Sequence, residues 1–322
     1  MNTVNSRDQP QTATVPDDLL GLRLDQVATT LFPRYSRGRL QAWIKNGALT
    51  VDGRPGKAKQ KLTGGECLTL IAEEEPQGDW IAQEIPLDIV FEDQHLLVLN
   101  KSAGLVVHPA AGNASGTLLN ALMHYYPELV NLPRGGIVHR LDKDTTGLMV
   151  VAKTLASHRS LVAQLQARTV ERRYEAVAMG SLHGAGTIDA PIGRHPRQRK
   201  KMAVVSRGGK EAVTHYDIAK RFPNHTYLRL KLETGRTHQI RVHLAHIGHP
   251  LVGDATYGGR RQLPKSASSA LVKAVQDLGR QALHARRLAL VHPQSGERQS
   301  WEAPTPADLS ALLDALAIEE AK

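Results

Sequence analysis

The segment 136–153, GIVHRLDKDTTGLMVVAK, holds the arrangement of side chains in this sequence that is best suited to chemistry. Short apolar, β-branched stretches flank a polar centre, and this pattern predicts two buried strands joined by a turn. A turn of this kind needs only a few polar residues, and carboxylates interleaved with Arg140 and Lys143 exceed that need. Because loops held between core strands are where scaffolds display reactive groups, Asp142 is our candidate catalytic carboxylate.

A plainer interpretation of the same segment is a solvated turn whose acids and bases pair locally, as most loop aspartates do. Asp142 differs in lying beside the apolar Leu141 and two residues after Arg140. A nearby guanidinium favours the charged form of a carboxylate at the edge of a core. The spacing favours the catalytic interpretation only modestly and leaves both open.

Length, charge and cysteine content restrict the class of protein. The 322 residues suggest about two domains, and the excess of 41 Lys and Arg over 31 Asp and Glu suggests a polyanionic partner. The single cysteine, Cys67, excludes an intramolecular disulfide and a cysteine-built zinc site. We see no secretory signal and no apolar run long enough for a membrane span, so we expect a soluble cytoplasmic protein with no membrane partner.

Composition shifts divide the chain into four parts. Polar residues 1–16 predict a disordered tail, and residues 17–75 predict a small domain of helices followed by strands. The acidic, Pro- and Gly-containing residues 76–84 predict a linker, and residues 85–322 form the second domain. Within the small domain, Asp52-Gly53 predicts a tight turn between strands.

Five segments of the second domain resemble the pseudouridine synthases, in the branch that modifies ribosomal and transfer RNA. They are NKSAGLVVHP (100–109), HRLDKDTTGLMVVAKT (139–154), RRYEA (172–176), ETGRTHQIRVH (233–243) and LVGDATYGG (251–259). The first departs from the family pattern at Ser102, where proline is commoner. This change relaxes one backbone angle and leaves the chemistry untouched. The small domain resembles the S4-type RNA-binding domain through RLDQ…YSRGRLQAWIKNGALTVDG.

The resemblance implies an α+β protein: a small N-terminal S4-like RNA-binding domain, then a catalytic domain with a mixed, mainly antiparallel sheet flanked by helices. The implied reaction is isomerisation of uridine to pseudouridine, which needs no cofactor and no metal. Asp142 would act as nucleophile or as base at the sugar, and Arg241 would pair with it. Tyr174 would stack on the flipped uracil and assist proton transfer, while Arg140 would fill the gap that the base leaves.

The resemblance also implies the substrate, 23S ribosomal RNA in a stem-loop at the subunit interface, either free or in an assembling large ribosomal subunit. We expect the enzyme to act as a monomer. RNA-facing residues are expected on the S4-like helix, in the basic run 193–210 and in the segment 233–243: Arg37, Arg39, Gln41, Lys45, Arg197, Arg199, Lys200, Arg236 and His238. Apolar side chains expected to line the uracil pocket are Ile137, Leu141 and Leu283.

Other functions were weighed against this one. Four histidines between 238 and 249 could suggest zinc, but their spacing is not that of zinc-binding helices, no acidic ligand stands in line, and neighbouring arginines would repel a cation. The HRLD sequence resembles a kinase catalytic loop, but the downstream Asn and the Gly-rich loop are missing. A non-catalytic RNA-binding or ribosome-assembly factor of the same fold, and an RNA hydrolase that uses the histidines, remain alternatives.

Overall fold

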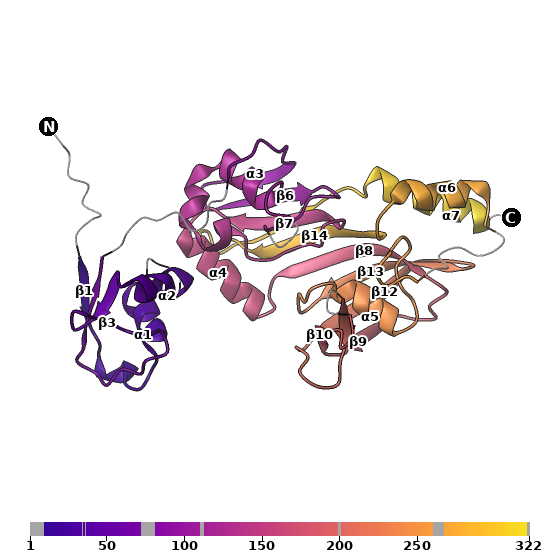
Figure 1. The fold of residues 1–322 in the computed structure, drawn as a ribbon. Helices are drawn as coiled ribbons and strands as arrows, with labels where there is room; N and C mark the ends of the chain where they lie inside the picture. Colours follow the sequence, from indigo (N-terminus) through magenta and orange to yellow (C-terminus); the bar gives the residue numbers. More distant parts are fainter. Residues whose placement is uncertain are drawn as a thin grey trace. The chain divides into compact units, whose positions relative to one another are not determined.

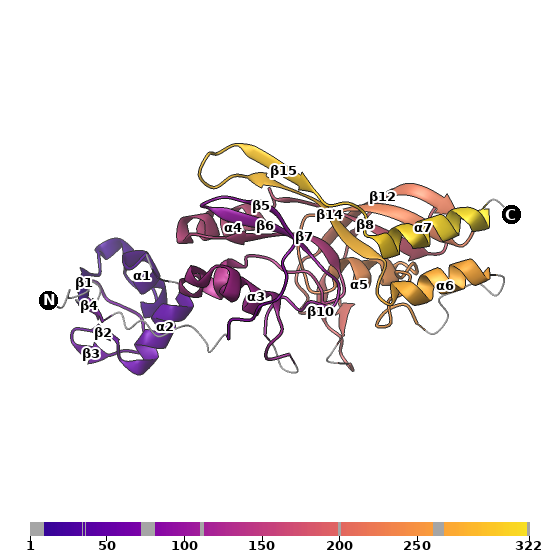
Figure 2. The ribbon, with the colours of Figure 1, turned by 90° about the horizontal axis from the view of Figure 1, so that it is seen from above.

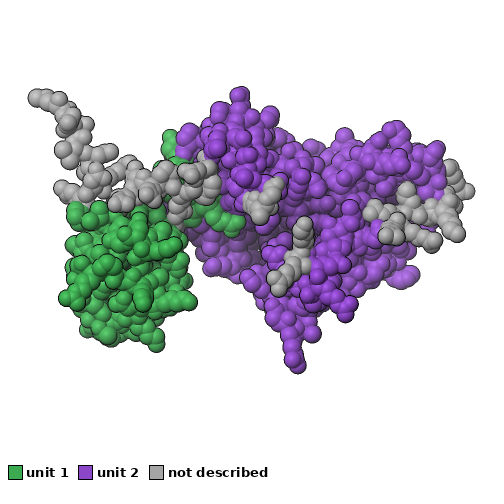
Figure 3. Space-filling model, in the orientation of Figure 1, with its two compact units in different colours: residues 1–80, 128–135 green, residues 81–127, 136–322 purple. Residues whose placement is uncertain are grey.

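The computed structural model describes residues 10–33, 35, 37–71, 81–109, 113–198, 201–259 and 267–320. The chain forms two compact units, one of residues 1–80 with 128–135 and one of residues 81–127 with 136–322 (Figure 3). No helix within the described ranges is long and apolar enough to cross a membrane.

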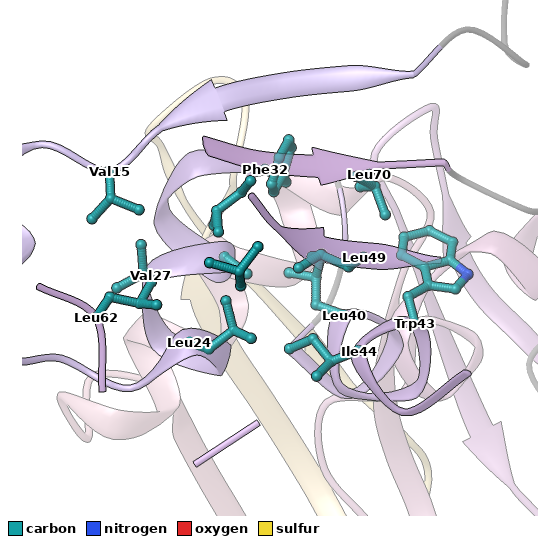
Figure 4. Close-up of a cluster of buried hydrophobic side chains, with 13 residues drawn as sticks. Val15, Leu24, Val27, Phe32, Leu40, Trp43, Ile44, Leu49, Leu62 and Leu70 are labelled. Atoms are coloured by element: carbon teal, nitrogen blue, oxygen red, sulfur yellow. The ribbon is translucent and has the colours of Figure 1, made fainter. Parts of the chain in front are cut away.

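The smaller unit consists of a four-stranded antiparallel sheet, in the order β1-β4-β2-β3, and two α-helices. Its elements in chain order are β1 (Gln11–Thr14), the 3₁₀ helix η1 (Asp17–Leu19), α1 (Leu24–Leu31), α2 (Arg37–Asn46), β2 (Leu49–Val51), β3 (Arg54–Pro55) and β4 (Cys67–Leu70). Leu24 and Val27 of α1 meet Leu40 of α2 in one apolar core (Figure 4). Leu24 and Val27 are three residues apart, so both side chains lie on one face of α1.

The turn predicted at Asp52-Gly53 joins β2 to β3. Both residues have positive φ, +50° and +73°, and Val51 pairs with Arg54 across the turn. This backbone matches the right-handed twist of the two strands, and glycine adopts it without steric cost. The expected hairpin is confirmed.

The predicted disordered tail is wrong for residues 11–14, which form strand β1 and pair with β4 along their whole length. Ala13 packs against the small core and Val15 is 1% exposed. The strand was missed because its other three residues are polar, while the stabilising contacts come from backbone pairing with a strand more than fifty residues away. Residues 1–9 of that tail lie outside the described part of the chain, as do residues 76–80 of the predicted linker.

The larger unit is built on a nine-stranded sheet in the order β5-β6-β7-β14-β8-β13-β12-β9, with β15 paired to β14 (Figures 1 and 2). Its main strands are β5 (Ile89–Glu92), β6 (Leu96–Lys101), β7 (Thr146–Ala152), β8 (Glu171–Met179), β9 (Gly186–Asp189), β12 (Val213–Phe222), β13 (His225–Leu232), β14 (Leu283–Val291) and β15 (Arg298–Glu302). Only the β7–β14 pair is parallel. The sheet is therefore mixed and mainly antiparallel, as expected.

A separate two-stranded hairpin pairs β10 (Ile192–Arg194) with β11 (Met202–Val204). The basic run 193–210, predicted as a mobile loop that interrupts a β pattern, is therefore partly ordered. The paired strands have three residues each, and the described residues between them are 195–198 and 201. Pairing across these short strands orders the part of the run next to them.

Helices flank the sheet at several places. They are α3 (Leu118–Tyr125), α4 (Leu155–Gln166), α5 (Gln239–His246), α6 (Ser269–Leu278) and α7 (Ala307–Glu320). The 3₁₀ helices η2 (Pro127–Asn131) and η3 (Pro133–Gly136) follow α3 in the chain, and their residues 128–135 belong to the smaller unit. Helices α6 and α7 lie side by side (Figures 1 and 2) and share an apolar cluster with Val177 of β8. Helix α6 was not predicted, although Leu271, Ala274 and Leu278 recur at helical spacing.

Strands β7 and β14 approach each other closely at Gly147. A Cβ atom at this position would lie 2.3 Å from the Ala285 carbonyl oxygen and 2.5 Å from the Ala285 nitrogen, and φ is +116°. Only glycine fits, because the obstructing atoms are backbone atoms that cannot rotate away. Gly147 therefore allows β7 to pair with β14 directly after the turn that carries Asp142.

We expect Gly147→Ala to lower the free energy of unfolding by about 2 kcal/mol or more, because steric overlap adds to backbone strain. Gly296→Ala is the matched control, since Gly296 also has positive φ, +72°, but a Cβ there would meet nothing within 4 Å. Urea denaturation of both variants measures the difference. Equal losses would contradict the role of the close approach at Gly147.

Candidate active site

Asp142 lies in the turn that leads into β7. Thr145 N donates a hydrogen bond of 3.1 Å to the Asp142 carbonyl oxygen and closes the turn. The side chain is 15% exposed, and its Oδ2 accepts a hydrogen bond of 3.0 Å from Arg241 Nη1. The expected pairing of Arg241 with Asp142, 99 residues apart in the chain, is present. The carboxylate is therefore nearly buried beside one compensating positive charge.

Arg241 is itself held by a second carboxylate, Asp254. Its Nε and Nη2 donate to the two oxygens of Asp254 at 2.7 and 2.9 Å, so the two-bond fork grips Asp254 and leaves Nη1 for Asp142. Burial alone would lower the pKa of Arg241, but the bonds and charge of Asp254, with those of Asp142, raise it. The guanidinium thus stays charged and has a fixed direction.

Asp254 is fully buried, and its carboxylate accepts hydrogen bonds from Arg241 and from two backbone nitrogens. Besides Arg241, its Oδ1 accepts from the backbone nitrogens of Thr256 and Tyr257 at 2.8 and 3.0 Å. Burial alone would raise the pKa of Asp254, but the Arg241 bonds and these two backbone bonds outweigh it and lower the pKa. Asp254 is therefore an anchor that sets the position of the arginine beside Asp142.

Behind the turn, Lys101 holds its backbone. Lys101 stands at the end of β6, is 1% exposed, and its Nζ donates to three carbonyl oxygens: Ser102 at 2.7 Å, Leu105 at 2.9 Å and Lys143 at 2.8 Å. Burial lowers the pKa of Lys101 to about 8, while the charges of Asp144 and Asp142 oppose that shift. The motif NKSAG thus supplies a buried ammonium that fixes the residue after Asp142.

Two further residues, just before β14, complete this support. Arg280 Nη1 donates to the Asp144 carbonyl at 3.3 Å, and Arg280 is itself paired by two bonds with Asp308. Gln281 Nε2 donates to Thr145 Oγ1 at 3.0 Å. Three consecutive residues of the turn, 143 to 145, are thus each bonded from behind by a buried side chain, which leaves the Asp142 carboxylate facing Arg241.

Tyr174 is placed by β8, where it pairs with Leu230 of β13 and is 7% exposed. Burial raises the pKa of its hydroxyl. The charge of Arg172 opposes that effect and the charge of Asp142 adds to it. The Asp142 carboxylate is therefore within electrostatic range of this ring. None of the hydrogen bonds between described residues uses the Tyr174 hydroxyl, so it is available to another group.

His238, expected on the RNA surface, lies beside the Asp142 carboxylate. Its Nε2 is 3.9 Å from Asp142 Oδ1, too long for a hydrogen bond, and its side chain is 24% exposed. Burial lowers the pKa of His238, and the charge of Asp142 opposes that effect. Arg236, also expected on that surface, is partly buried and donates through Nε to the Glu211 carbonyl at 2.8 Å.

The three expected pocket residues are buried, with exposed fractions of 1% for Ile137 and 4% for both Leu141 and Leu283. Ile137 bridges to Val151 of β7, and Leu283 pairs with Ala176, two residues after Tyr174. Arg140, by contrast, is exposed, and its charge lowers the pKa of His238. The segment around Asp142 thus has an apolar side and a solvent-facing cation.

In the smaller unit, two of the four residues expected to face RNA bind an internal carboxylate. Asp25 is fully buried and accepts from Arg37 at 2.8 Å and from Gln41 at 2.6 Å, besides a pair with Arg23. Burial alone would raise the pKa of Asp25, but these bonds lower it. Gln41 is therefore part of the internal network, whereas the Arg37 side chain remains 47% exposed.

The other two residues of that helix do not bond Asp25. The Arg39 guanidinium stands 4.9 Å over the Trp43 ring, and Lys45 is exposed. In the larger unit, Arg197 is exposed at the tip of the β10–β11 hairpin. Arg199 and Lys200, predicted with it, lie outside the described residues.

The histidines that could have suggested zinc have separate partners. His243 bonds Thr214 Oγ1 and the Ala190 carbonyl, both at 2.9 Å, and His249 bonds the Met179 carbonyl at 2.9 Å. Across the described ranges there is no group of three or more His, Cys, Asp or Glu residues arranged to hold a metal ion.

Comparison with known proteins agrees with this architecture. A model of the RNA pseudouridylate synthase family matches residues 95–246, the range that contains Asp142, Tyr174 and Arg241. Two solved structures are similar in fold. Human RNA pseudouridylate synthase domain containing 1 has a TM-score of 0.53 at 28% identity, covering 70% of this chain and 86% of that one. Human RNA pseudouridylate synthase domain containing 4 has a TM-score of 0.54 at 26% identity, covering 71% and 93%.

Similarity to curated relatives extends over nearly the whole sequence. The chain is 60% identical over 304 residues to the ribosomal large subunit pseudouridine synthase D of Pseudomonas aeruginosa, an alignment that covers 94% of this chain and 95% of that protein. It is 54% identical over 306 residues to the protein of the same name from Escherichia coli K12, covering 95% and 94%. The chain belongs to the RNA pseudouridylate synthase family, and it is an isomerase of that class, as its motifs predicted.

Sequence reasoning missed the residues that support the site. Lys101 stood inside a recognised motif, but a lysine gives no sign in sequence that it is buried. Asp254 lies inside the segment LVGDATYGG, and a carboxylate within a segment that resembles the family was the signal that could have pointed to it. Arg280 and Gln281 carry no local signal, because their partners lie 136 residues earlier in the chain.

His139 gives a test of the packing around the turn. Its Nε2 accepts a hydrogen bond of 3.0 Å from Val150 N, and burial, helped by the charge of Arg172, lowers its pKa from 6.5 to about 3. Between these values the unfolded chain binds a proton that the folded chain does not. The contribution of His139 to the free energy of unfolding is therefore complete above pH 6.5. It falls toward pH 3 by up to about 1.4 kcal/mol per pH unit.

We expect His139→Gln, which keeps an acceptor for Val150 N, to show a shallower loss of stability between pH 6.5 and 3 than the wild type. Urea denaturation at a series of pH values gives both slopes. Identical slopes would mean that His139 does not contribute to the acid sensitivity.

Proposed function

We propose that this chain converts specific uridines of 23S ribosomal RNA to pseudouridine, in a large-subunit stem-loop at the subunit interface, with Asp142 as the catalytic group. The names of the relatives support the ribosomal substrate. The observation that carries the catalytic assignment is the single nearly buried carboxylate that receives Arg241 Nη1 while its backbone is held from behind. An acid built into a fixed position is one prepared for reaction.

The reaction breaks one bond at C1′ of the ribose and forms another at the same carbon. The bond from uracil N1 to C1′ breaks, the base rotates, and a bond from C5 to C1′ forms. The proton on C5 leaves and N1 gains one, so nothing is added overall and no cofactor is needed. Asp142 acts either by attacking C1′ or as a base at the sugar, and in both roles Arg241 balances its charge.

Tyr174 and Arg140 act on the base and on the helix it leaves. Because a base inside a duplex is out of reach, the uridine must be flipped from its stack before Asp142 meets the sugar. The Tyr174 ring stacks on uracil, and its hydroxyl assists the final proton transfer from C5. Ile137, Leu141 and Leu283 supply the apolar wall of this pocket. Arg140, exposed beside Asp142, enters the gap in the RNA.

RNA is bound by cations on both units. Arg37, Arg39 and Lys45 of the smaller unit contact phosphates, as do Arg197, Arg199 and Lys200 of the basic hairpin and Arg236 near the site. Such contacts set affinity and register and carry little sequence choice. The enzyme works as a monomer in the cytoplasm, on free ribosomal RNA or an assembling large subunit. The excess of basic residues supports the polyanionic partner.

We expect Asp142→Asn to bind RNA normally and form no pseudouridine, because the amide can neither attack nor accept the proton. The assay is release of tritium from C5 of uridine in a 23S transcript, with RNA affinity measured separately. Asp144→Asn is the matched control, two residues along the same turn, and should keep full activity. Turnover by Asp142→Asn would remove the catalytic assignment, and a wild-type protein that binds RNA but releases no tritium would favour the non-catalytic RNA-binding alternative.

We expect Tyr174→Phe to fold and bind RNA, and to release tritium at least about tenfold more slowly, because a positioned acid or base contributes that much or more. Tyr125→Phe, which removes a hydroxyl that bonds Glu92 on an exposed side chain, is the control and should be unaffected. A wild-type rate in Tyr174→Phe would restrict the residue to stacking.

A further inference from the structure

Tyr257, three residues after Asp254, packs against two of the residues around Asp142. Its ring lies 5.1 Å from the Arg241 guanidinium carbon and meets the His238 ring edge-on, with centroids 5.7 Å apart. Its backbone nitrogen donates to Asp254 Oδ1. The side chain thus touches both the arginine that orients Asp142 and the histidine beside Asp142.

The hydroxyl of Tyr257 has two partners. It accepts a hydrogen bond of 3.0 Å from Met202 N, and it lies 2.8 Å from His238 Nδ1. Within the described ranges it has no other acceptor, so its proton points to Nδ1. A neutral His238 with Nδ1 as acceptor carries its own proton on Nε2, the nitrogen 3.9 Å from Asp142 Oδ1. The tyrosine hydroxyl therefore favours the tautomer of His238 in which the N–H is on the nitrogen nearer the carboxylate.

The same hydroxyl reaches the basic hairpin. Met202 is the first residue of β11, and the preceding Lys201 donates through Nζ to the Thr256 carbonyl at 2.8 Å. The hairpin whose tip carries Arg197 is thus bonded at its base to the loop that holds Asp254. The Tyr257 hydroxyl is therefore bonded both to the residue beside Asp142 and to the hairpin.

We propose that Tyr257 is a positioning residue for the isomerisation: its hydroxyl fixes the tautomer of His238 so that an N–H faces Asp142, and ties that arrangement to the basic hairpin. The role belongs to the hydroxyl, since phenylalanine would keep the ring against Arg241 and the backbone bond to Asp254. The inference rests on Asp142 being the catalytic group.

The first test needs no variant. Nitrogen NMR of the full chain labelled at histidine, with His238 assigned by its loss in His238→Gln, reports which ring nitrogen is protonated. We expect neutral His238 with the proton on Nε2 in the wild type, and loss of this preference in Tyr257→Phe. A wild-type proton on Nδ1 would overturn the proposal.

The second test separates rate from affinity. With enzyme in saturating excess over tritiated 23S transcript, we expect Tyr257→Phe to react about tenfold more slowly in a single turnover, the effect of one lost hydrogen bond, with RNA affinity within about twofold. Tyr216→Phe is the control, because within the described chain its hydroxyl makes no hydrogen bond, and it should react at the wild-type rate. An unchanged rate in Tyr257→Phe, or a loss confined to affinity, would overturn the proposal.

A double variant identifies the route. If Tyr257 acts through His238, then Tyr257→Phe combined with His238→Gln should be no slower than His238→Gln alone, and additive losses would contradict this. The outcome for Asp142→Asn stays separate. Activity in Asp142→Asn defeats the catalytic assignment, whereas an inactive Asp142→Asn beside a wild-type Tyr257→Phe defeats only the role given to Tyr257.

Discussion

One guanidinium shared by two carboxylates determines the geometry of this enzyme. Arg241 gives its fork to Asp254 and only its remaining nitrogen to Asp142. Arg241 is therefore fixed by two bonds to Asp254 and makes one bond to Asp142. This division suits the catalytic role proposed for Asp142, because one bond leaves part of the carboxylate available, while a carboxylate with no partner would be costly to bury.

The sheet topology explains why the site can be so well fixed. The parallel β7–β14 pair brings the start of both strands together, so the turn before β7 meets the residues that precede β14. Arg280 and Gln281 reach the turn from there, and Lys101 reaches it from the end of β6, the other neighbour of β7. The support therefore comes from the end of β6 and from the short segment that leads into β14, both anchored to the central strands of the sheet.

Local patterns were enough to predict the hairpin at Asp52-Gly53, and the family motifs were enough to predict the sheet type and the Asp142–Arg241 pair. Patterns failed where stability comes from distant partners. Strand β1 is polar and exists through its pairing with β4, and Lys101 reads as a surface residue although it is buried. The position of His238 beside Asp142, at the left-handed residue (φ +56°) just before α5, carries no sign in the sequence either. Such features depend on the assembled fold, which local periodicity does not encode.

The manner in which Lys101 grips the turn has an evolutionary consequence. It bonds the main-chain carbonyl of residue 143 and makes no use of that residue's side chain. Position 143 can therefore drift in amino-acid type without loosening the loop, whereas a change at position 101 has no local remedy. Among divergent members of the family, variation should thus accumulate on the outward side chains of this loop, while the remote residues that hold its backbone stay the same.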